Sequence, residues 1–207
     1  MSQQFLSFFL AAALGLVPAA LDLQGPRPAR AGDEEVYLTP DQAPRVLFPE
    51  ATSVAKRVVP MTPELRAKME ARIVPTRPSL WEGAIPTYIA SAEGRVVGYA
   101  VVVNEIGKHR PITFVVGVRP DGKVRGVEIM IYREPKGGEV RMKGFLRQYR
   151  GKRVDSPILT GRDITNLSGA TLSVRAVNRG TKKALALAQI VYHEAPPAPP
   201  AGASASS

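Results

Sequence analysis

The chain has 207 residues, of which 44% are hydrophobic, and a formal net charge of +10. This hydrophobic content favours a globular domain over a disordered chain. The absence of cysteine excludes disulfides, thiolate zinc sites, cysteine-ligated iron–sulfur clusters and c-type haem attachment. Two histidines far apart in sequence, His109 and His193, give little support to a metal site or a Ser-His-Asp triad. No zinc finger, RNA-binding signature or helix-turn-helix pattern accompanies the basic residues, so nucleic acid is not an expected partner.

The first 31 residues read as a targeting segment. Residues 5–21 form a nearly unbroken apolar run that is short for a membrane-spanning helix, and Ala29-Arg30-Ala31 is a small-x-small site. This pattern predicts a signal peptide over residues 1–31, cut after Ala31. Because Met1–Gln4 carry no Lys or Arg, an uncleaved N-terminal anchor is the alternative. Either form predicts a periplasmic or other extracytoplasmic protein, with or without a membrane anchor.

Residues 33–80 are expected to form an N-terminal extension of helices and irregular chain. Two Thr-Pro pairs, each placing a cap before a proline at the first helical position, predict helices over residues 39–48 and 62–71. Weak alternation indicates a strand over residues 53–60. Trp81, in a proline-rich stretch, is interpreted as a core or lid aromatic rather than a ligand contact.

The centre of the chain predicts an antiparallel four-stranded meander. Its strands are joined by tight turns at Glu93-Gly94-Arg95 and Pro120-Asp121-Gly122-Lys123, and they cover residues 87–92, 96–104, 112–118 and 124–132. Alternation in the last strand suggests one buried face. The expected fold class is therefore α+β, with this meander packed against helices.

A change in composition follows the last strand. Residues 132–141 hold two glycines, a proline and five charges, which is typical either of a functional loop or of a long surface turn. A short helix over residues 142–149 is expected to turn Phe145, Leu146 and Tyr149 inward. Basic residues surround it and are either a solvated face or a contact for phosphate or a partner; they are Arg141, Lys143, Arg147, Arg150, Lys152 and Arg153.

The strongest helical pattern covers residues 173–193. Apolar residues recur at helical spacing from Val174 to Val191, and Arg179, Lys182 and Lys183 lie off that stripe. The tail, residues 194–207, is almost entirely Pro, Ala, Gly and Ser and is predicted to be disordered. The folded domain is thus expected over residues 81–193.

The junction before this helix, Ser168-Gly169-Ala170-Thr171-Leu172-Ser173, is the candidate functional motif. A helix starting there presents unpaired N–H groups and the positive end of its dipole, which suits a phosphate. The hydroxyls of Thr171 and Ser173 can carry a phosphate as an ester. The alternative is that Ser168 is an ordinary N-cap, since such a tetrapeptide arises by chance in roughly one chain in fifty.

Four pieces, in this order, resemble the FMN-binding domain family found in the NqrC subunit of the sodium-pumping NADH:quinone reductase and the RnfG subunit of the Rnf complex. They are Gly98-Tyr99-Ala100, residues 111–118 with Asp121-Gly122-Lys123-Val124, the loop from Tyr132 to Glu139, and Ser168-Gly169-Ala170-Thr171. The sequence looks most similar to the free-standing periplasmic members.

The resemblance implies that a flavin transferase moves FMN from FAD to Thr171 as a phosphoester. It places the phosphate at the N–H groups of Leu172 and Ser173, with Arg133 and Glu134 beside the flavin ring. The residues expected to bind FMN are Thr171, Ser168, Gly169, Ala170, Leu172, Ser173, Tyr132, Arg133, Glu134, Gly138 and Glu139; no catalytic or metal-binding residue is expected. Thr165 stands where family members carry an Asp that the transferase reads, and Asp163 lies two residues earlier.

The expected function is an extracytoplasmic electron-transfer flavoprotein, a carrier rather than a substrate-transforming enzyme, because no acid/base pair is evident. Its basic surface would dock to an acidic cytochrome, to a membrane oxidoreductase subunit or to a membrane surface. The alternatives are a small extracytoplasmic flavin reductase and a flavin-free basic module that binds an anionic polymer or lipid.

Overall fold

The structure is a computed structural model that describes residues 34–194. The elements, in chain order, are β1 (Glu35–Val36), α1 (Ala43–Leu47), β2 (Ser53–Pro60), α2 (Pro63–Ile73), β3 (Ala84–Ala92), β4 (Arg95–Ile106), β5 (Pro111–Val118), β6 (Val124–Tyr132), the 3₁₀ turn η1 (Gly138–Arg141), α3 (Lys143–Leu146), the 3₁₀ turn η2 (Arg147–Tyr149), α4 (Thr171–Ala188) and the π-helical end η3 (Gln189–Glu194).

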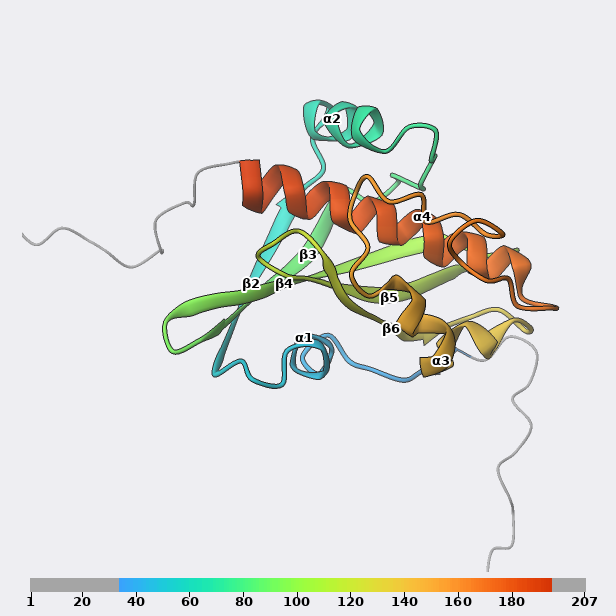
Figure 1. The fold of residues 1–207 in the computed structure, drawn as a ribbon, viewed down its shortest axis with the longest axis horizontal. Helices are drawn as coiled ribbons and strands as arrows, with labels where there is room; N and C mark the ends of the chain where they lie inside the picture. Colours follow the sequence, from blue (N-terminus) through green and yellow to red (C-terminus); the bar gives the residue numbers. More distant parts are fainter. Residues whose placement is uncertain (1–33, 195–207) are drawn as a thin grey trace, which may run out of the picture.

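These strands form one antiparallel sheet in the order β1-β6-β5-β4-β3-β2 (Figure 1). The α+β class and the meander β3-β4-β5-β6 are confirmed, but a sheet of only four strands is wrong. The predicted strand at residues 53–60 is β2, which pairs with β3 along its whole length. The unpredicted β1 adds two residues to the other edge, where Glu35 lies opposite Tyr132.

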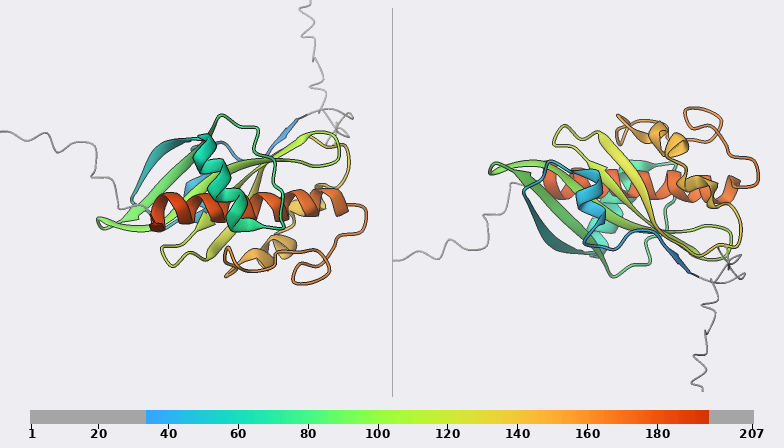
Figure 2. Two further views of the ribbon diagram at one scale, coloured as in Figure 1. Left: turned by 90° about the horizontal axis from the view of Figure 1, so that it is seen from above. Right: turned by 90° about the horizontal axis from the view of Figure 1, so that it is seen from below.

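Helices cover both faces of the sheet (Figures 1 and 2). The larger core lies between the sheet, α4 and α2, and a smaller one lies under α1, where Leu47 and Phe48 pack on Val115 and Met130. The single buried face predicted from the last strand is wrong, because β6 contributes Val127 and Ile129 to the larger core and Met130 to the smaller one. β5 is buried from Ile112 to Val118. The helix approaches the sheet closely at Gly180, where an added Cβ would lie 2.3 Å from the Phe114 ring.

The predicted helices are confirmed, with shifted ends. The long C-terminal helix begins at Thr171 rather than at residue 173, and its apolar stripe is buried. Phe145, Leu146 and Tyr149 point inward as expected, although two 3₁₀ turns flank a single turn of α-helix there. Trp81 is 58% exposed and so is not part of the core.

The two lysines expected outside the apolar stripe of α4 are buried. Lys183 is fully buried and Lys182 is 7% exposed. Lys183 Nζ donates to Glu82 Oε1 (2.6 Å), to Ser79 O (2.6 Å) and to Asn104 O (3.1 Å). The chain between α2 and β3 thus covers this side of α4 and supplies the polar partners that let a lysine be buried.

The predicted signal peptide over residues 1–31 lies outside the described residues, and so does the predicted tail over residues 194–207 except for Glu194, which ends η3. Within residues 34–194, no helix combines the length and the apolar character needed to cross a membrane. The division between an extension (33–80) and a domain (81–193) stays a prediction.

Candidate functional site

A cavity of about 400 Å³ separates the loop after β6 from the first turn of α4. The two segments predicted to bind FMN, the loop after β6 and the start of α4, both line this cavity, and so does the turn between β4 and β5. Its walls are Lys108, His109, Glu134, Pro135, Lys136, Gly169, Ala170, Thr171, Leu172 and Ser173.

The first turn of α4 presents free donors to this cavity. The first intrahelical bond runs from Val174 N–H to Ala170 O (2.9 Å), so the N–H groups of the three residues before Val174 have no acceptor within the helix. Ala170 occupies the N-cap position without a side-chain hydrogen bond, so the alternative reading of Ser168 as a helix cap is wrong. Gly169 has φ +79°, and an added Cβ would meet nothing within 4 Å, which leaves its backbone open to a ligand.

Thr171 is the half-buried first residue of α4. Its Oγ1 accepts a hydrogen bond from Asn166 Nδ2 (3.0 Å). The Asp163 carboxylate is committed elsewhere: it binds Lys152 Nζ (2.7 Å) and the N–H groups of Ile158 and Leu159. Burial would raise the pKa of Asp163, but these contacts outweigh burial and lower it.

Tyr132 fastens the loop to α4. Its buried hydroxyl donates to Lys136 O (2.6 Å) and shares a hydrogen bond with Ser173 Oγ (2.8 Å); burial is the main cause of its raised pKa. Gly137 lies beneath this pair with φ +88°, and an added Cβ would lie 2.7 Å from Ser173 Oγ. Ser173 and Tyr132 therefore hold the wall of the cavity in place.

Glu134 shapes the opposite wall. Its Oε1 accepts the N–H groups of His109 (2.6 Å) and Arg110 (2.9 Å). Burial favours the neutral acid, but backbone N–H groups in residues 108–110 outweigh it and lower the pKa of Glu134. Arg133 turns away from the cavity, because it binds Glu34 Oε2 (2.9 Å) and Thr113 Oγ1 (2.8 Å).

A second cavity of about 400 Å³ lies on the other side of the same loop. Glu134, Pro135 and Lys136 line both cavities and so form the ridge between them. The other predicted residues of the loop, Tyr132, Gly138 and Glu139, line only the second. Its remaining walls are Glu35, Tyr37, Arg141 and Met142.

Sequence reasoning missed the turn of residues 107–110 and the N-terminal strand. This turn precedes β5, and the start of β5 pairs with the end of β6, where Thr113 lies opposite Ile131. The pairing of the β5–β6 hairpin therefore already places residues 107–110 beside the loop that follows β6. Two residues of β1 carry no periodic signal that could have placed Glu35 there.

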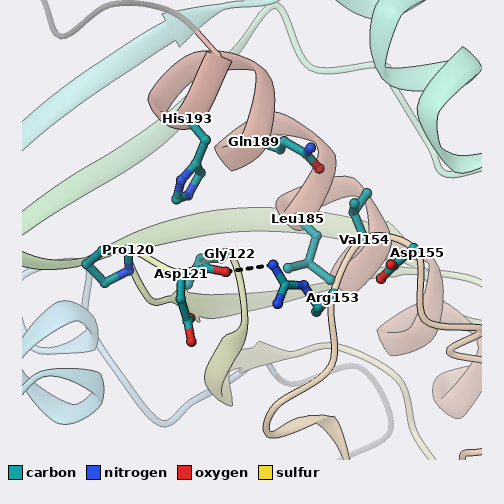
Figure 3. Close-up of a pocket in the computed structure, with 10 residues that line it drawn as sticks. Pro120, Asp121, Gly122, Arg153, Val154, Asp155, Leu185, Gln189 and His193 are labelled. Atoms are coloured by element: carbon teal, nitrogen blue, oxygen red, sulfur yellow. Dashed lines mark hydrogen bonds between the residues drawn. The ribbon is translucent and has the colours of Figure 1, made fainter.

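A third cavity, also about 400 Å³, lies at the far end of α4 (Figure 3). His193 points toward the turn between β5 and β6, Gln189 lines the cavity as well, and an Arg153 guanidinium N–H donates to Asp121 O (3.0 Å). None of the residues predicted to bind FMN lines it. Within residues 34–194, no group of three or more His, Asp or Glu side chains could hold a metal ion.

Residues 107–186 match the model of the FMN-binding domain. This stretch contains the three segments that line the first cavity: the turn after β4, the loop after β6 and the start of α4. The match supports FMN as the cofactor. The G subunit of the ion-translocating oxidoreductase complex of Vibrio atlanticus is 26% identical over an alignment of 162 residues, and the match covers 72% of this chain and 78% of that protein. The match to the family model confirms the resemblance to the FMN-binding domain that was predicted from the sequence.

Two other relatives match over shorter stretches. The protein of the same name from Shewanella oneidensis is 29% identical over 50% of this chain and 55% of its own length. The G subunit of the proton-translocating ferredoxin:NAD(+) oxidoreductase complex of Clostridium ljungdahlii is 28% identical over 47% of this chain and 57% of its own. The chain thus matches just over half the length of these two. The crystal structure of Shewanella oneidensis NqrC aligns over 72% of this chain and 86% of that one, with 16% identity and a TM-score of 0.49.

Proposed function

We propose that the chain is an electron-transfer flavoprotein carrying FMN as a phosphoester on Thr171, on the premise that residues 107–186 match the model of the FMN-binding domain. The observation that carries the proposal is the position of this threonine. Thr171 lines the first cavity, beside the free N–H groups of α4 and the open backbone of Gly169.

The cavity fits the phosphate end of such a cofactor. Its volume lies within the range of about 300–1,000 Å³ typical of small-molecule sites. A phosphodiester at the helix start would face backbone N–H groups and the positive end of the helix dipole. Lys108 and Lys136 add two cations to the walls, which favours the same charge.

Attachment is a phosphoryl-type transfer without redox change. A bond forms between Thr171 Oγ1 and the phosphorus of the FMN half of FAD, while the bond from that phosphorus to the bridging pyrophosphate oxygen breaks. AMP leaves with that oxygen, and the hydroxyl proton is released to AMP or to solvent. A flavin transferase supplies FAD and catalyses the exchange.

FMN supplies the one- and two-electron redox chemistry when bound. The residues of this chain hold and shield it. Glu134 keeps the turn of residues 108–110 folded against the cavity, and Tyr132 and Ser173 keep the loop in contact with α4. Exposed Pro135 and Leu172, which line the first cavity, give a partner an apolar surface beside the cofactor.

The proposed partners are redox proteins: a subunit of a membrane oxidoreductase complex or an acidic cytochrome. Support comes from the names of the relatives, which are subunits of ion-translocating and proton-translocating oxidoreductase complexes. The net charge of +10 would speed association with an acidic surface. The apolar segment at residues 5–21 supports an extracytoplasmic location.

Intact-mass spectrometry of the full chain, coexpressed with a flavin transferase and exported, tests the proposal. We expect a mass increment equal to one FMN less one water, located on the peptide that contains Thr171. Thr171→Ala should remove it, whereas Thr52→Ala, a change at an exposed threonine far along the chain, should leave it.

An increment that survives Thr171→Ala would refute the phosphoester. Saturable turnover of a small soluble acceptor by the loaded protein would identify a reductase instead of a carrier. A colourless protein that binds anionic vesicles in a salt-sensitive way would identify the flavin-free module.

A further inference from the structure

We propose that Asn166 is a positioning residue for flavin attachment: its side-chain amide holds Thr171 Oγ1 before the phosphoester forms and remains its donor afterwards. This inference rests on the proposed function of Thr171. It assigns a role to a residue that neither the predicted motif nor the family resemblance includes.

The contact itself is the first argument. Asn166 Nδ2 lies 3.0 Å from Thr171 Oγ1 and comes from the loop that leads into α4. The other hydroxyl of the motif that lines the cavity, that of Ser173, is already paired with Tyr132. Asn166 is therefore the side chain of the described region that fixes the rotamer of the acceptor threonine.

The second argument is that Thr165 and Asp163, the residues at and near the position of the family's Asp, have other partners. Thr165, at the position where the family carries an Asp, is exposed, and its backbone N–H is held by Gln148 Oε1 (2.8 Å). Asp163 is occupied by Lys152 and by two backbone N–H groups. The side chain that reaches the acceptor oxygen is thus that of Asn166, one position after Thr165.

The third argument is the chemistry of an amide donor. A hydroxyl can donate its own proton and also accept, so an N–H directed at Oγ1 occupies one lone pair and leaves the proton and the other lone pair free. An ester oxygen has no proton and can only accept. The amide N–H suits both states, whereas a carboxylate here would lose its donor partner and repel the phosphodiester.

The first measurement is the rate of FMN attachment to the unloaded full chain, with purified transferase and FAD. We expect Asn166→Ala to slow attachment roughly tenfold, the size of one lost hydrogen bond in a transition state. The isosteric Asn166→Asp should slow it at least as much. Thr165→Ala is the matched control in the same loop and should attach FMN within about twofold of the unaltered rate.

The second measurement does not depend on what the transferase reads. In the loaded protein, the ³¹P resonance of the phosphodiester should shift in Asn166→Ala. In Asn166→Asp it should titrate between about pH 3 and 6, since a carboxylate near its ordinary pKa would then lie beside the phosphate. Thr165→Asp, with the same new charge one residue earlier, should show little of this titration.

The outcomes separate this inference from the proposed function. If Thr171→Ala keeps the FMN increment, both are overturned. If Thr171→Ala loses it but Asn166→Ala attaches FMN at the unaltered rate, or Asn166→Asp and Thr165→Asp titrate alike, only the role of Asn166 is overturned. Faster attachment by Asn166→Asp would also overturn it, because the transferase would then favour an acidic residue over the amide donor. Far-UV circular dichroism and the melting temperature check that each variant is folded.

Discussion

Replacing Lys183 by methionine should strongly destabilise the fold, because this side chain neutralises two carboxylates in the core. Lys183 is fully buried, and its Nζ lies 2.6 Å from Glu82 Oε1 and 3.8 Å from Glu105 Oε1. Glu105 is fully buried as well, and burial is the main cause of its raised pKa. Methionine matches lysine as far as Cε and lacks the ammonium group, so it removes the charge and its hydrogen bonds while keeping an apolar stem.

The expected loss is about 3–5 kcal/mol in the free energy of unfolding, the range for breaking one partner out of a buried ion pair. The structure supports that range over the value of about 0–1 kcal/mol typical of surface pairs. Four acceptors lose their donor or cation, among them Ser79 O and Asn104 O. For a domain of this size, such a loss lowers the melting temperature by roughly 6–20 °C.

The loss should depend on pH in a defined direction. Without Lys183, the folded-state pKa of Glu105 rises further above its unfolded value of about 4.3. Stability linked to a raised carboxyl pKa is present below the unfolded pKa and is lost as the pH rises through the folded pKa. The difference from the unaltered protein should therefore be smallest near pH 4 and largest at neutral pH.

Urea unfolding of the full chain, followed by circular dichroism at pH 4, 5.5 and 7, measures this difference. Lys68→Met, a change at an exposed lysine of α2, is the control and should alter stability by less than about 0.5 kcal/mol. A loss below about 1 kcal/mol for Lys183→Met at pH 7, or one that grows on acidification, would refute the assignment of a buried charge cluster.

Three further changes test the walls of the cavity. Tyr132→Phe, which breaks the bond to Ser173, should lower stability by about 1–2 kcal/mol and reduce the fluorescence anisotropy of bound flavin. Gly137→Ala should cost more in urea unfolding than Gly151→Ala, since both have positive φ but only the Cβ at Gly137 meets atoms closer than 3 Å. Glu134→Gln should lower the free energy of unfolding at pH 7. Because the pKa of Glu134 is lowered in the folded state, the ionised carboxylate stabilises the fold above the unfolded pKa, and this stabilisation is lost as the pH falls through the folded pKa. The difference in stability between the two proteins should therefore shrink on acidification.

The meander could be predicted from local sequence because glycine-containing turns mark the ends of its strands. Gly94 and Gly122 adopt φ +74° and +77°, the left-handed conformation that glycine permits, and apolar runs flank them. β1 could not be predicted, since two residues define no alternation and their pairing depends on β6. The burial of Lys183 also escaped prediction, because the residues that cover it lie about a hundred positions earlier in the chain.

The candidate site was predictable to a similar extent. Helix-start chemistry and family resemblance together pointed to Thr171 and to the loop after β6, and these segments share a cavity. The resemblance did not reveal that Arg133 turns outward to Glu34, since nothing local to Arg133 fixes its direction. Nor could it reveal the contact from Asn166, which depends on how the preceding loop folds back over the helix start.

The two ends of the described chain lie at opposite ends of α4 (Figure 1). Glu35 lines the second cavity, whereas Glu194 ends the π-helical turn and pairs with Arg72 of α2. The eighteen residues of α4, which begin with Thr171, place this threonine about 25 Å from that turn. Immobilising the protein on an electrode through a tag after Glu194 therefore leaves the first and second cavities facing solution, while a tag joined just before Glu34 brings them against the electrode surface. The same two attachments compare electron transfer through a soluble mediator with direct transfer to the electrode.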